Sequence, residues 1–141
     1  MAKLVIFVVI LCVGFVFAEK EIVRLPPEIV GQILQGAMLC IGETGVSPEV
    51  LVQYRSGKPL GDDKNLQMFI HCLLVKNGFA DKTGHVKTDK ALDVFPKTTD
   101  TEAVKKVIHE CNKQTAANPA EMSYKFVKCF RQKAHNVISL N

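Results

Sequence analysis

Cysteines carry the clearest chemistry in this sequence of 141 residues. There are five, at Cys12, Cys40, Cys72, Cys111 and Cys129. Cys12 lies in an apolar N-terminal segment, which leaves an even set of four in the rest of the chain. An even set in an exported chain indicates disulfides, and four cysteines allow three pairings. Zinc is the alternative, but no two cysteines have the short CxxC-type spacing of a zinc site. The sequence therefore predicts two disulfides and no metal site.

The other reactive side chains form no catalytic pattern. The serines lack the flanking glycines of a nucleophile elbow, and no cysteine is left over as a thiol nucleophile. The histidines are scattered, and none is paired with an aspartate beside a glycine-rich calcium loop, as a secreted phospholipase requires. We therefore expect no enzyme activity, no catalytic residue and no cofactor. The residues considered are Ser47, Ser56, Ser123, Ser139, His71, His85, His109 and His135.

The first eighteen residues are typical of a secretory signal peptide. Lys3 supplies the positive start, residues 4–17 are continuously apolar, and Ala18 precedes charged Glu19. A membrane anchor is the alternative, but an apolar run of this length is short for a spanning helix. We predict a signal peptide of residues 1–18 and one secreted domain of residues 19–141, with no stable membrane insertion.

The charge balance excludes a nucleic-acid partner. The formal net charge is +4 for the whole chain and falls to +3 when Lys3 leaves with the signal peptide. The charges are interspersed, and no aromatic-basic alternation accompanies them. The balance points to no charged partner of any particular kind.

The stretch from Lys64 to Gly78 predicts the central helix of the domain. Asp63 is suited to its N-cap, and Asn77-Gly78 to its end. So broad an apolar face must be covered by other helices. The apolar residues at helical spacing are Leu66, Phe69, Ile70, Leu73 and Leu74.

Five further helices are predicted from their start signals. They open at Pro27, Ser47, Thr88 or Asp89, Asp100 and Asn118. The fourth helix is expected to reach Phe95, before Pro96, and residues 79–86 to form a turn. On the last helix we expect Lys125, Lys128, Arg131 and Gln132 to face water. The result is an all-α domain of about six short helices.

Each of the four remaining cysteines lies on the apolar side of a different helix. The fifth and sixth helices are adjacent, which favours Cys111–Cys129 as a hairpin crosslink. Cys40–Cys72 then follows by elimination and joins the first helix to the central one.

This cysteine frame resembles that of the insect odorant-binding proteins, which include pheromone-binding and haemolymph carriers. The family's usual frame has six cysteines, and the second and fifth of them pair. At those positions this sequence has Met68, with three residues between it and Cys72, and Ala120, with eight residues between it and Cys129. Both partners are absent together, as in the minus-C subgroup. The family's other two pairings coincide with those expected above.

The resemblance implies that the helices surround an internal apolar cavity, although core packing is the better expectation for any single residue. Tyr54 is the one expected lining residue with a hydroxyl that could orient a polar ligand head. The predicted ligand-binding residues are Ile33, Leu51, Tyr54, Ile70, Leu74, Val104, Ile108, Phe126 and Phe130.

The predicted function is that of a secreted carrier of odorants, pheromones or similar small lipophiles through sensillar lymph, haemolymph or glandular fluid. A membrane receptor and a second copy in a homodimer are the candidate protein partners. The alternative is a secreted amphipathic antimicrobial or venom-type component that acts on membranes. Against it, the charge is low and the apolar faces are expected to cover one another. The apolar tail residues Val137, Ile138 and Leu140 are candidates for a lid.

Overall fold

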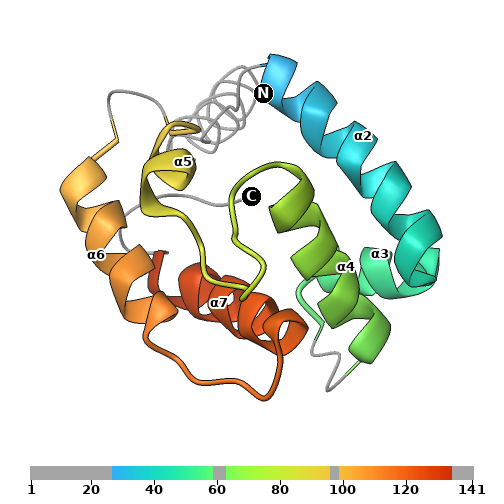
Figure 1. Ribbon diagram of the computed structural model, residues 1–141. Coiled ribbons are helices and arrows are strands. Elements are labelled where there is room, and N and C mark those ends of the chain that lie inside the picture. Colours follow the sequence, from blue (N-terminus) through green and yellow to red (C-terminus); the bar gives the residue numbers. More distant parts are fainter. Residues whose placement is uncertain (1–26, 59–62, 96–98, 135–141) are drawn as a thin grey trace, which may run out of the picture.

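The computed structural model describes residues 27–58, 63–95 and 99–134. Its helices in chain order (Figure 1) are α2 Pro27–Thr44, α3 Pro48–Arg55, α4 Lys64–Lys76, α5 Thr88–Leu92, α6 Thr101–Asn112 and α7 Pro119–Ala134. Within these ranges the only β-type pairing is an isolated bridge between Ala80 and Val86. The all-α prediction is confirmed. The expected signal peptide and the apolar tail lie outside the described residues.

Side-chain caps begin four of the helices where the sequence predicts them. The Ser47 hydroxyl accepts a hydrogen bond from the Val50 amide at 3.2 Å, and the Asp63 carboxylate accepts one from Leu66 at 2.8 Å. Asp100 caps α6 and Asn118 caps α7 in the same way, at 3.1 and 2.9 Å. Each cap satisfies an amide that the first helical turn leaves without a partner.

The prediction for α5 was wrong at both ends. Its N-cap residue is Lys87, which makes no side-chain capping bond, and the helix ends at Leu92. The chain then continues in tight turns, with the Phe95 amide donating to the Leu92 carbonyl at 3.2 Å. Because the residue before a proline disfavours helical geometry, the helix gives way to turns before Pro96.

α4 lies at the centre of the arrangement, against α7 on one side and α2 on the other, while α6 packs on α7 and α5 packs on α6 (Figure 1). Two disulfides fix these contacts. Cys40–Cys72 joins α2 to α4 with Cα atoms 5.8 Å apart, and Cys111–Cys129 joins α6 to α7 at 5.6 Å. Both predicted pairings are confirmed.

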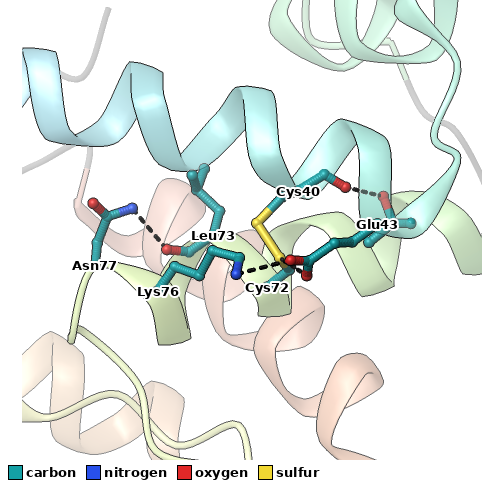
Figure 2. The surroundings of a disulfide bond; sticks show 7 residues. Cys40, Glu43, Cys72, Leu73, Lys76 and Asn77 are labelled. Atoms are coloured by element: carbon teal, nitrogen blue, oxygen red, sulfur yellow. Dashed lines mark hydrogen bonds and ion pairs between the residues drawn. A yellow bond between two sulfur atoms is a disulfide. The ribbon is translucent and has the colours of Figure 1, made fainter.

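The first disulfide is flanked by polar contacts between the same two helices (Figure 2). The Lys76 ammonium lies 2.9 Å from the Glu43 carboxylate, and both are partly exposed. The Asn77 amide caps the end of α4 by donating to the Leu73 carbonyl at 2.8 Å. The Asn77 side chain also faces Gly36 on α2, where an added Cβ would lie 3.0 Å from its nitrogen. Gly36 therefore lets α2 lie close to the end of α4.

Among the described residues, the apolar interior consists of two clusters. The α6–α7 cluster contains Val86, Val104, Val107, Ile108, Cys111, Phe126 and Ala134. The α2–α4 cluster contains Cys40, Val46, Leu66, Phe69 and Ile70. Leu74 and Val127 are partly buried and pack against both clusters. The α4–α7 contact is therefore the junction between the two parts of the core.

One apolar stripe of α2 stays on the surface. Val30, Leu34 and Met38 follow one another at one-turn intervals and are 40%, 61% and 76% exposed. The expectation that the apolar faces cover one another holds for α6 and α7, but α2 keeps a second apolar side.

Candidate functional site

The structure separates the nine predicted ligand-binding residues by burial. Four are buried core side chains: Ile70, Val104, Ile108 and Phe126. Five retain accessible surface: Ile33, Leu51, Tyr54, Leu74 and Phe130. A ligand can contact accessible apolar surface without displacing the core, so the second group is the better candidate for a binding surface.

The five partly buried residues lie on α2, α3, α4 and α7 and pack against the two clusters to different extents. Leu51 and Tyr54 of α3 pack against the α2–α4 cluster, and Phe130 of α7 packs against the α6–α7 cluster. Leu74 contacts both. Ile33 belongs to neither cluster and lies half-buried on α2.

Phe130 is part of an aromatic group. Its ring stacks on Phe126 at a centroid distance of 5.9 Å, and Phe95 lies tilted against it at 6.4 Å. Phe95 was not among the predicted site residues. Its place in the apolar stripe before Pro96 was the signal that could have identified it.

Tyr54 has a charged neighbour that the sequence did not predict. The Arg131 guanidinium lies over the Tyr54 ring, 5.0 Å from its centroid, and links α7 to α3. The prediction that Arg131 faces water was wrong, because its side chain is half-buried against this ring. The stripe pattern of α7 could not show this contact, since the partner lies on a helix far away in the sequence.

A polar group lies between α4, α7 and the turn of residues 79–86. His71 Nδ1 lies 2.8 Å from the Ser123 hydroxyl, which lies 3.4 Å from the Gly84 carbonyl. Both bonds are satisfied when Nδ1 donates to the hydroxyl and the hydroxyl donates to Gly84. Burial lowers the pKa of His71, while nearby Asp81 raises it by a smaller amount. Ser123 has no exposed surface, so this histidine–serine pair offers no nucleophile that a substrate can reach.

The turn itself is held by Asp81. Its carboxylate accepts hydrogen bonds from the Thr83 amide at 2.9 Å, the Thr83 hydroxyl at 2.5 Å and the His85 amide at 3.2 Å. These bonds, the Thr83 hydroxyl first, lower the pKa of the Asp81 carboxyl.

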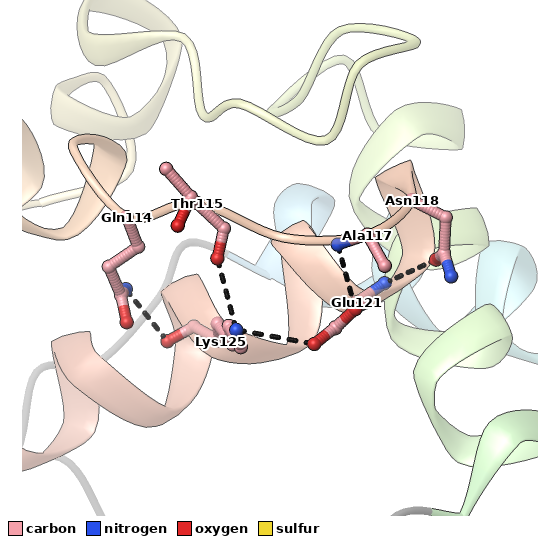
Figure 3. Close-up of polar contacts among 6 residues, drawn as sticks. All are labelled: Gln114, Thr115, Ala117, Asn118, Glu121 and Lys125. Atoms are coloured by element: carbon pink, nitrogen blue, oxygen red, sulfur yellow. Dashed lines mark hydrogen bonds and ion pairs between the residues drawn. The ribbon is translucent and has the colours of Figure 1, made fainter.

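The positions of the two missing family cysteines border one surface hollow of about 460 Å³ between the starts of α4 and α7. Met68 and Ala120 both line it, together with Lys64, Gln67, Asn118 and Glu121. The Glu121 carboxylate accepts from the Ala117 amide at 2.9 Å and pairs with Lys125 at 3.2 Å (Figure 3). These polar contacts fix the start of α7 within its own segment and do not join it to α4.

Two further observations concern the described ranges as a whole. None of the described helices is long and apolar enough to cross a membrane. No group of three or more histidine, cysteine or acidic side chains there is arranged to hold a metal ion.

Comparison with known proteins agrees with this architecture. General odorant-binding protein 69a of Drosophila melanogaster is 22% identical over 124 residues, covering 88% of this chain and 83% of the relative. The fatty acid binding protein OBP56a of the blowfly Phormia regina superposes with a TM-score of 0.68 at 19% identity, covering 80% of this chain and 97% of the other. Odorant Binding Protein 7 of Anopheles gambiae, with four disulfide bridges and in complex with an azo compound, gives 0.67 at 26%, covering 81% and 92%.

The sequence pattern of the PBP/GOBP family matches residues 24–133, which contain α2 to α6, all of α7 except its last residue, and both disulfides. This family and fold are those of odorant-binding carriers of small hydrophobic ligands, not of enzymes. With two disulfides from four cysteines, the chain corresponds to the minus-C form. The protein belongs to the PBP/GOBP family.

Proposed function

We propose that the protein is a secreted carrier that binds small hydrophobic molecules in an apolar cavity among its helices and transports them through an extracellular fluid. The observation that carries this proposal is a set of half-buried apolar side chains that border the two clusters. Leu51 and Tyr54 of α3 pack against the α2–α4 cluster, and Phe130 of α7 packs against the α6–α7 cluster. Leu74 of α4 packs against both clusters. These side chains have accessible apolar surface and no catalytic partner. They are therefore suited to binding a ligand through burial of its apolar surface alone.

Relatives support this class of ligand. The blowfly protein is named as a fatty acid binding protein, and the mosquito protein holds an azo compound. Both ligands are largely apolar. We propose ligands of similar character for this chain.

The energetics suit a carrier that must also release its ligand. A ligand that buries about ten methylenes gains at most ~8 kcal/mol. Lost rigid-body freedom reduces this gain. We therefore expect dissociation constants near 1 μM, equivalent to about −8 kcal/mol.

A displacement titration tests the proposal. The purified domain of residues 19–141 is titrated with the fluorescent probe N-phenyl-1-naphthylamine, which is then displaced by lipophiles of graded length. Saturable micromolar binding with displacement is the expected result. Absence of saturable probe binding by folded protein would overturn the carrier function.

The membrane-active alternative is tested in parallel on liposomes loaded with a self-quenching dye. The exposed apolar stripe of Val30, Leu34 and Met38 is the observation that makes this control necessary. A carrier leaves the liposomes intact at concentrations that saturate probe binding. Dye release without probe binding would favour the alternative.

A further inference from the structure

We infer that Arg131, held over Tyr54, is an anchor for an anionic head group, and that the preferred ligands are carboxylate-bearing lipophiles. This inference rests on the proposed carrier function and specifies its ligand class. It concerns the contact between α3 and α7, where the guanidinium lies 5.0 Å from the Tyr54 ring centroid.

Arg131 differs in its ion pairing from two lysines of α7. The side chain is half-buried, yet within residues 27–58, 63–95 and 99–134 no carboxylate forms an ion pair with it. In contrast, Lys125 and Lys133 of the same helix pair with Glu121 and Glu110. A cation–π contact uses none of the N–H donors of a guanidinium, so these donors stay available for a bidentate contact with a carboxylate.

Arg131 lies next to apolar surface of the two clusters. Tyr54 packs against the α2–α4 cluster, and Val127, one turn before Arg131 on α7, packs against both clusters. The same side of α7 therefore presents a cation followed by apolar surface. An amphiphile with its head at Arg131 can place its chain along Val127 and the neighbouring Leu74. This order of charge and apolar surface matches a fatty carboxylate.

The Arg131 side chain is preorganised for binding. The cation–π contact with Tyr54 limits the rotamers of the long Arg131 side chain, so less conformational entropy is lost when a carboxylate binds. A lone lysine on an exposed helix face would not offer this advantage.

The test compares decanoic acid with decan-1-ol as displacers of N-phenyl-1-naphthylamine at pH 7.5. We expect the acid to bind about tenfold or more tightly than the alcohol, as a charge-assisted hydrogen bond predicts. Arg131→Met should remove this preference and leave the affinity for decan-1-ol unchanged. Lys128→Met is the matched control, because Lys128 lies on the exposed side of α7 and should leave the preference intact. Thermal melting verifies that each variant is folded.

Raising the salt concentration from 0.05 to 0.5 M should weaken binding of the acid but not of the alcohol. Equal binding of acid and alcohol by the unmodified protein would overturn the anchor and leave the carrier function standing. Equal loss of both ligands in Arg131→Met would also overturn it, because Arg131 would then only support the fold. If neither ligand displaces the probe and the probe itself does not bind, the carrier function fails, and the two failures are thus distinguished.

Discussion

Met68 on α4 and Ala120 on α7 line the same surface hollow, at the two positions where the family's missing disulfide would join these helices. The long methionine side chain is 43% exposed, and the small alanine lines the same space. Methionine fills irregular gaps, but it cannot restrain two helices as a covalent bond does. The contact between the starts of α4 and α7 therefore lacks the crosslink that secures it in six-cysteine members of the family.

The double variant Met68→Cys and Ala120→Cys should form a third disulfide under oxidising conditions. The expected gain is about 2–4 kcal/mol in the free energy of unfolding, measured by urea denaturation. Each single cysteine variant is the control, because neither can form the bond. Two free thiols in the oxidised double variant, found by thiol titration, would show that the two backbones cannot reach disulfide geometry.

Truncation to alanine should separate core from ligand surface. Ile108 is 1% exposed, so Ile108→Ala should cost about 2–5 kcal/mol in the free energy of unfolding. Phe130 is only partly buried, so Phe130→Ala should cost less stability but weaken probe binding more. Urea denaturation and probe titration of both variants check the two effects. Unchanged probe affinity in Phe130→Ala would place Phe130 in the core alone.

Most of the framework could be predicted from the sequence because its signals are local. Ser47, Asp63, Asp100 and Asn118 cap helices a few residues away, and the apolar periodicity identifies each buried face. These features depend on near neighbours in the chain. Cys111–Cys129 followed from the adjacency of its two helices and Cys40–Cys72 by elimination, and both were confirmed.

The candidate site was harder to predict because it depends on contacts between distant segments. Arg131 has the sequence context of a solvent-facing residue, and only the position of α3 places Tyr54 beneath it. Similarly, periodicity could not distinguish buried Val104 from half-buried Leu74, since both are apolar residues on helix faces. Burial is a property of the packed helices and not of one helix.

Stability should decrease as the pH falls from neutrality because of His71. Burial lowers its pKa in the folded state below the ordinary value of 6.5, so the unfolded chain binds the proton more tightly. The contribution of neutral His71 to stability is fully present above pH 6.5 and is lost as the pH falls through the lower folded-state pKa.

Urea midpoints measured between pH 8 and pH 5 check this expectation. His71→Gln should flatten the decrease, whereas His109→Gln, at an exposed position, should not. Asp81 acts in a separate, more acidic range. Its folded-state pKa lies below the ordinary value of 3.8, so its contribution to stability is fully present above pH 3.8 and is lost as the pH falls through the folded-state pKa. A decrease of the same size in His71→Gln would assign the effect to other groups.

Gly84 should be the least replaceable glycine of the described turns. Its φ is +89°, and an added Cβ would lie 2.3 Å from the Pro119 carbonyl oxygen, a backbone atom that cannot move away freely. Gly78 has a similar φ of +76°, but nothing lies within 4 Å of its added Cβ. The two positions therefore share the backbone strain and differ only in the steric clash.

Gly78→Ala should cost about 1 kcal/mol, the usual penalty for a left-handed non-glycine residue. Gly84→Ala should cost clearly more, since it also forces the turn away from α7 and stretches the Ser123–Gly84 hydrogen bond. Urea denaturation of both variants measures the difference, and hydrogen exchange should quicken first at the start of α7. Equal losses in the two variants would show that the turn moves away from Pro119 without cost and that its contact with α7 does not stabilise the fold.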